Sequence, residues 1–269
     1  MVSNFTMIAM AIQAGAGVLL PIITIAVLSK KYGCRIKHFF VGILVFMVFV
    51  VMLETRFHGM MLSSPNGAAI QNNPLLMALY SAAAAALFEE IGRYVAFRFI
   101  LNRDMESDIN ALSYGAGHGG FECFYLLAAT GANNLLMALS YRTAGMDAMM
   151  TLADGDAAVA QSLADTLVQT PAWMFLLSVA ERCFAIAMHM GLSVLVWFAV
   201  KARGGKLSLL LLSIGLHFAV DFITVLLNGK LPAALLEVVV GVLAVGVVLA
   251  ARTVWKRYAE PAESEGAAA

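Results

Sequence analysis

Several ionisable side chains lie inside long apolar stretches of this sequence, where charges are rare. The acidic residues are Glu89, Glu90, Glu122, Glu181 and Asp221, the basic residues are Arg93 and Arg182, and the histidines are His118, His189 and His217. A charged side chain at the centre of a membrane helix costs roughly 2.5 to 3.5 kcal/mol. We therefore expect these groups to pair with one another, to contact water or to bind a metal ion.

Most of these side chains repeat at helical spacing. Residues four or seven positions apart lie on one face of a helix. The pairs with these spacings are Glu89 with Arg93, His118 with Glu122, Arg182 with His189, and His217 with Asp221. Each of four helices therefore presents one polar face. At about 1.5 Å per residue, Glu89 and the three histidines come out at similar depth, so we expect the four faces to converge.

These residue types supply the groups needed for hydrolysis. In this interpretation Glu89 is the general base that activates water. His118 and His217 either orient that water and stabilise the oxyanion or, together with His189, bind zinc or another divalent metal. The other candidate catalytic residues are Glu90, Arg93, Glu122 and Asp221, and the candidate structural ion pair is Glu181 with Arg182. The pattern alone leaves metal-dependent and metal-free glutamate mechanisms open.

The composition shows what must position these groups. The chain has 269 residues, of which 61% are hydrophobic and 13% charged. An ordinary soluble domain is roughly 45–50% apolar and about 25% charged, so that class is excluded. Lys plus Arg and Asp plus Glu both number 17, a balance that does not fit a nucleic-acid-binding protein. The three cysteines have no metal-binding spacing.

Apolar stretches long enough to cross a bilayer predict an all-α, polytopic membrane protein of about seven transmembrane helices. The predicted spans are residues 5–29, 38–60, 75–101, 108–129, 171–200, 207–228 and 232–255, the fourth with a partial continuation to Tyr141 after a break at residues 131–134. The first stretch is interpreted as a membrane helix and not as a removed leader. We expect a multi-pass protein of a cell membrane such as the prokaryotic cytoplasmic membrane.

Lys and Arg residues fall unequally between these spans. One side has Lys30, Lys31, Arg35, Lys37, Arg98, Arg103, Lys201, Arg203, Lys206, Arg252, Lys256 and Arg257, whereas the other has Arg56, Arg142 and Lys230. Basic connections face the cytoplasm, so the N-terminus is expected outside and the C-terminus in the cytoplasm. We also expect the site to open towards the cytoplasm.

The predicted organisation is a single bundle over residues 1–260 with a catalytic core at 75–228. Residues 142–170 form an outer-face loop, in which Val159, Leu163 and Leu167 indicate a short surface helix. Residues 261–269 are expected to be a disordered tail.

Four segments, in order, resemble motifs of the CAAX protease and bacteriocin-processing superfamily of intramembrane proteases, closest to its YhfC branch and related to PrsW-type proteases. They are Glu89-Glu90-Ile91-Gly92-Arg93, Tyr114 to His118 with Tyr in place of Phe, His217 to Asp221, and the group of Gly119, Gly120, Glu122, Glu181, Arg182 and His189. In this sequence two residues separate the glutamate pair from the basic residue Arg93, whereas three residues separate them in the CAAX branch.

The resemblance implies an intramembrane endopeptidase that acts on a membrane-associated peptide or protein in the lipid bilayer. It implies Glu89 as base, His118 and His217 as catalytic partners and Asp221 as the orienting group. Asp221 cannot donate a hydrogen bond unless protonated, and an ionised Asp221 favours either an imidazolium or a metal-bound imidazole at His217. The metal-bound form agrees with the metalloprotease label of the YhfC branch. Two other interpretations stay open: an ion- or proton-coupled transporter, and a catalytically silent scaffold or immunity protein.

Overall fold

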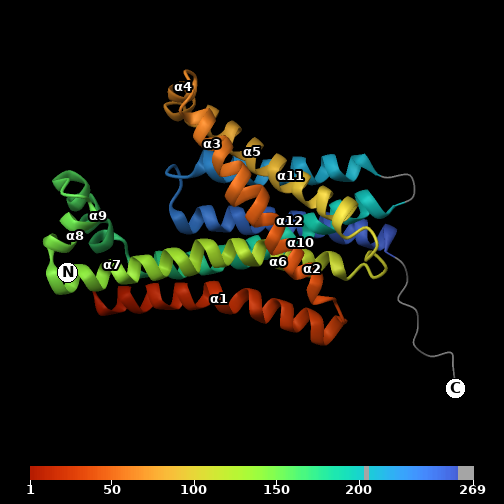
Figure 1. Ribbon diagram of the computed structural model, residues 1–269, viewed down its shortest axis with the longest axis horizontal. Helices are drawn as coiled ribbons and strands as arrows, with labels where there is room; N and C mark the ends of the chain where they lie inside the picture. Colours follow the sequence, from red (N-terminus) through yellow and green to blue (C-terminus); the bar gives the residue numbers. More distant parts are fainter. Residues whose placement is uncertain (203–205, 260–269) are drawn as a thin grey trace.

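The computed structural model describes residues 1–202 and 206–259, so the expected tail at 261–269 lies outside the described residues. Within those ranges all regular elements are helices, and seven helical segments are long and apolar enough to cross a membrane (Figure 1). The all-α, seven-span prediction is therefore confirmed, and the chain is a multi-pass membrane protein.

The seven spans consist of one to three helical elements each. They are α1 (Asn4–Tyr32); α2 (Ile36–Phe46) with the π-helical η1 (Met47–Glu54) and α3 (Thr55–Leu62); α5 (Pro74–Val95) with the π-helical η2 (Ala96–Ile100); α6 (Asn110–Cys123) with the π-helical η3 (Phe124–Ala129) and α7 (Thr130–Ala144); α10 (Ala172–Lys201); α11 (Leu207–Leu227); and α12 (Ala233–Tyr258). The short α4 (Gly67–Gln71) lies between the second and third spans.

Local sequence signals explain several helix ends. The Ser3 side chain accepts a hydrogen bond from the Thr6 amide at the start of α1, and Gly33 with φ +67° ends that helix. Asn73 caps α5, whose first residue is Pro74, a position where proline loses no helical hydrogen bond.

The fourth span differs from the prediction because it has no break at residues 131–134. It continues as one helical segment to Ala144. A Cβ atom on Gly131 would lie 2.8 Å from the Ala14 amide nitrogen, so this glycine allows α7 and α1 to pack closely. Gly131, which the sequence suggested was part of a helix break, instead lies at a close contact between two helices.

The segment after α7 contains two helices where one was predicted. These are α8 (Met146–Leu152) and α9 (Ala157–Gln169), which lie beside the N-terminus of α1 (Figure 1). The buried face of α9 consists of Ala160, Ala164 and Leu167, whereas Val159 is 48% exposed. The helix α9 covers the segment where a short surface helix was expected, and its small alanines let it pack against α8 and α7.

The basic connections meet at one end of the bundle, here called the basic end. Arg35 and Lys37 form ion pairs with Asp104, and Lys201 pairs with Asp108 at 2.8 Å. The Lys37 ammonium, by its hydrogen bond, holds the pKa of Asp104 below its ordinary value. The N-terminus, α8 and α9 lie at the other end, here called the far end (Figure 1). The structure thus gathers the basic connections at one end, and the orientation of that end toward the cytoplasm stays a prediction.

The centre of the bundle is α10. In its most apolar stretch 72% of the residues are buried, compared with 22% for α12. On its basic-end half, Trp197 packs against Phe97, and Phe97 packs against Tyr114 with ring centroids 5.2 and 4.6 Å apart. All three rings are fully buried. We call these three residues the aromatic layer. It lies on the basic-end side of the polar side chains described next.

Candidate metal and catalytic site

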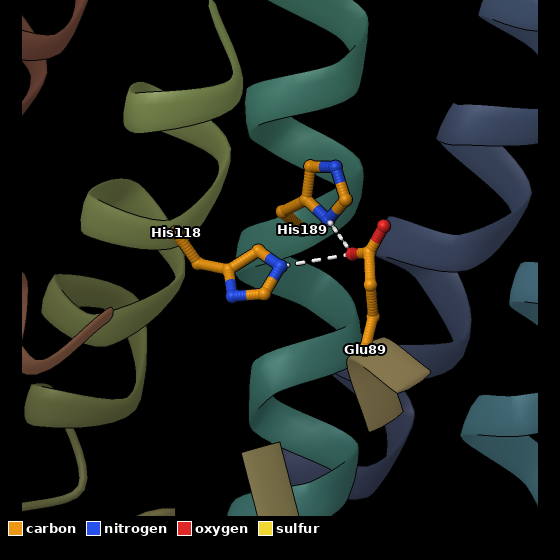
Figure 2. A group of neighbouring side chains, drawn as sticks. All are labelled: Glu89, His118 and His189. Carbon is orange, nitrogen blue, oxygen red and sulfur yellow. Dashed lines mark hydrogen bonds and ion pairs between the residues drawn. The ribbon is translucent and has the colours of Figure 1, made fainter. Parts of the chain in front are cut away.

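Four helices bring Glu89 of α5 together with His118 of α6, His189 of α10 and His217 of α11. The His118 Nε2 atom donates a hydrogen bond to Glu89 Oε2 at 2.8 Å. His189 Nδ1 lies 3.7 Å from the same oxygen, and His217 Nε2 lies 3.9 Å from Glu89 Oε1. Figure 2 shows the Glu89 carboxylate directed toward both His118 and His189. The structure therefore places the predicted layer around one carboxylate.

Arg93 lies one turn after Glu89 and is fully buried. One guanidinium nitrogen donates to Glu90, and the other, Nη2, donates to Glu89 Oε2 at 3.2 Å and to His189 Nδ1 at 2.6 Å. Because arginine can only donate, His189 Nδ1 must be the acceptor. Its proton is then on Nε2, which donates to Glu122 Oε2 at 2.6 Å.

Glu90 turns away from Glu89 into a closed network. Besides the contact with Arg93, it accepts a hydrogen bond from the Ser213 hydroxyl at 2.7 Å and one from His217 Nδ1 at 2.8 Å. The two neighbouring carboxylates therefore have different surroundings, as expected for residues about 100° apart on a helix. Glu90 fixes the ring of His217, whose Nε2 lies 3.4 Å from Asp221 Oδ2.

The predicted pair of Glu181 with Arg182 belongs to a larger network. Arg182 contacts Glu181 through one guanidinium nitrogen and donates to Glu122 Oε1 at 2.7 Å through the other. Glu122 thus joins Arg182 to His189. A carboxylate on the second nitrogen of a histidine is the usual arrangement for a metal-binding imidazole.

The donor atoms that lie closest together differ from the predicted three-histidine set. Among the described residues, one ligand atom each from Glu89, His118 and His189 lie within 4.8 Å of one another, and all three residues are buried. Two histidines with one glutamate form a known zinc-binding set, so these residues fit a divalent metal ion. His217 is not in this group, although its Nε2 atom lies 3.9 Å from Glu89 Oε1.

Two cavities touch Glu89 and Glu122. The α11 cavity, about 200 Å³, is lined by residues that include Ala85, Glu181, His217, Asp221 and Thr224. The η1 cavity, about 180 Å³, is lined by residues that include Phe46, Glu54, Thr55, Tyr125 and Leu126. At about 30 Å³ per water molecule, either volume accommodates several waters. The site therefore has room for a nucleophilic water and part of a substrate.

Glu54 is the main site residue that the sequence reasoning missed. It is only 6% exposed and lies in the wall of the η1 cavity. It contacts His58 Nε2 at 3.2 Å, and His58 Nδ1 bonds the Tyr80 hydroxyl at 2.7 Å. The signal was present, because Glu54 and His58 are four residues apart like the other acid–histidine pairs. Ser213, the partner of Glu90, was also missed.

Comparison with known proteins covers most of the chain. A sequence model of the family described as YhfC intramembrane metalloprotease matches residues 16–243, which include all the site residues above. The chain is also 33% identical over 248 residues to a protein of Bacillus subtilis (strain 168) named uncharacterized membrane protein YhfC, covering 91% of this chain and 94% of that protein. No solved structure matches the chain.

Proposed function

The chain belongs to the YhfC intramembrane metalloprotease family, and from this premise we propose that it hydrolyses a peptide bond of a membrane-associated protein in the cavities beside Glu89. The observation that carries the proposal is the buried Glu89 carboxylate, bonded by His118 and bordered by both cavities. A carboxylate in such a place, with imidazoles around it, is suited either to binding a metal ion or to deprotonating water.

Glu89, His118 and His189 would hold the metal ion, with zinc as the first candidate. When bound, the ion polarises a carbonyl oxygen and makes a water molecule easier to deprotonate. The single lone pair of His189 Nδ1 cannot serve an ion and the Arg93 guanidinium together, so Arg93 would then keep Glu90 as its partner.

His217 and Asp221 would move the proton that hydrolysis requires. Water forms a bond to the carbonyl carbon and loses a proton, and the C–N bond breaks when the tetrahedral intermediate collapses and the leaving amine takes up a proton. Glu90 fixes His217 Nδ1, which leaves Nε2 near Asp221 and the α11 cavity. In the metal-free alternative, Glu89 accepts the proton of the water, while His118 and His217 stabilise the oxyanion.

The test compares wild type with Glu89→Gln in proteoliposomes that also contain membrane proteins, with new N-termini identified by mass spectrometry. We expect the wild type to generate specific N-termini and Glu89→Gln to reduce them at least about 100-fold. Glu237→Gln is the matched control, because it makes the same change on α12 outside both cavities that touch Glu89. Undiminished cleavage by Glu89→Gln would remove Glu89 from the mechanism.

A further inference from the structure

The α11 cavity extends from the site toward the far end. On α5, Ala85 precedes Glu89 by one turn; on α10, Glu181 precedes His189 by about two turns. Both helices run from the far end to the basic end, whereas α11 runs back. There Thr224 follows His217 by seven residues, about 10 Å, and lies three residues before the helix ends at Leu227. All three lining residues are therefore on the far-end side of the site.

The η1 cavity extends in the same direction. Phe46 lies at the level of the site, since its ring packs against His118 with centroids 5.0 Å apart. The second span runs toward the far end, so Glu54 and Thr55 lie about two turns beyond Phe46. On the fourth span, which runs the same way, Leu126 lies about two turns beyond His118. Two cavities between different helices thus agree in direction.

The basic-end side of the site is filled by the aromatic layer. Tyr114 lies one turn from His118 toward the basic end. In the same direction, Phe97 lies about two turns from Glu89, and Trp197 lies about two turns from His189. The three rings have no exposed surface. Below them, the Trp197 indole donates to Asp108 at 2.9 Å, which ties α10 to the connection after the third span. These rings therefore close the centre of the bundle on the basic-end side of the site.

We propose that water and substrate reach Glu89 from the far end, which the distribution of Lys and Arg makes the non-cytoplasmic face of the membrane. The inference rests on the proposed function and specifies its substrate: a membrane-associated protein whose cleaved bond enters from the non-cytoplasmic half of the bilayer. It reverses the expectation from the sequence that the site opens towards the cytoplasm. The acidic lining of the α11 cavity, Glu122, Glu181 and Asp221, keeps this entrance wet.

The test measures from which side a cavity residue can be labelled. Thr224→Cys is made in a chain whose native cysteines, Cys34, Cys123 and Cys183, are replaced by serine. Sealed vesicles of both orientations are treated with a charged, membrane-impermeant methanethiosulfonate. Two exposed positions report the faces: Gln161→Cys on α9 for the far end and Glu106→Cys for the basic end. Ser193→Cys, buried one turn below His189, is the matched control.

We expect Thr224→Cys to be labelled from the same side as Gln161→Cys, at least tenfold faster than Ser193→Cys. Ala85→Cys provides the same measurement from α5 if Thr224→Cys does not fold. In intact cells, Gln161→Cys should be labelled and Glu106→Cys protected. Labelling of Thr224→Cys from the Glu106 side, or from neither side, overturns the proposal. Labelling does not need catalysis, so a chain without protease activity still shows from which side the cavity is reached. An active protease labelled from the Glu106 side would refute only the proposed side of entry and not the proposed function.

Discussion

Glu89 and Glu90 are adjacent in the chain, but only Glu89 borders the two cavities. Glu90 has no exposed surface, and its oxygens are taken by Arg93, Ser213 and His217. The helical rotation between the two residues therefore separates a carboxylate that can meet water from one that organises its neighbours. Glu90 is best described as a positioning residue for His217.

Glu90→Gln should destabilise the protein much more than Glu89→Gln. The amide removes the nearer of the two carboxylate charges that pair with the buried Arg93 guanidinium, and breaking a buried ion pair typically costs about 3 to 5 kcal/mol. The measurement is the thermal unfolding midpoint of each variant in detergent, with Glu237→Gln as the control expected to stay close to wild type. If Glu90→Gln unfolds at the wild-type temperature, the network around Arg93 is not stabilising.

The two possible metal sets can be separated by elemental analysis. If Glu89, His118 and His189 hold the ion, Glu89→Gln, His118→Ala and His189→Ala should each reduce zinc content at least tenfold, while His217→Ala retains it. A three-histidine set would instead make His217→Ala as damaging as the other two. Full proteolytic activity in a wild-type preparation free of metal would favour the glutamate mechanism.

At the scale of elements, glycines decide how closely α2 approaches the helix that carries His118. A Cβ atom on Gly117 would collide with the Phe39 carbonyl group, and one on Gly42 with the carbonyl of Tyr114. Backbone atoms cannot turn aside as a flexible side chain can. The two helices must therefore separate if either glycine is enlarged, and Phe46 would lose its contact with His118.

Gly117→Ala should therefore lower stability by about 1 to 3 kcal/mol, the usual cost of overpacking a core. The matched control is Gly246→Ala on α12, where an added Cβ atom meets nothing within 4 Å among the described residues. Thermal unfolding of the two variants in the same detergent gives the comparison. Equal midpoints would mean that α2 and α6 are not as close as the structure has them.

The membrane-spanning helices and their polar faces were largely predictable from the sequence, whereas the contacts between helices were not. Long apolar stretches reveal the spans by length alone, and spacings of four reveal His118 with Glu122 because both follow from helix geometry. Gly131 was misread, since a glycine marks either a break or a close approach, and only the position of α1 distinguishes them. Glu54 was missed because its burial depends on packing between spans: η1, which carries it, packs against α5.

At the scale of the whole molecule, the two ends of the bundle differ. The basic end is filled by the aromatic layer and joined by ion pairs such as Lys201 with Asp108. Toward the far end, the helices leave the α11 and η1 cavities. No sequence pattern predicted this direction, because depth along each helix can be counted from the chain, whereas the spaces between helices depend on how they tilt.

This asymmetry also separates a protease from the transporter alternative. A carrier must offer its polar groups to both faces in turn, whereas Phe97, Tyr114 and Trp197 fill the basic-end side with rings that pack on one another. We therefore expect proteoliposomes to show no more proton flux than protein-free liposomes, measured with a trapped pH-sensitive dye under an imposed pH gradient. A protonophore gives the maximum signal, and Glu89→Gln should match wild type. Flux that increases with the amount of wild-type protein and disappears in Glu89→Gln would instead make the buried carboxylate part of an ion pathway.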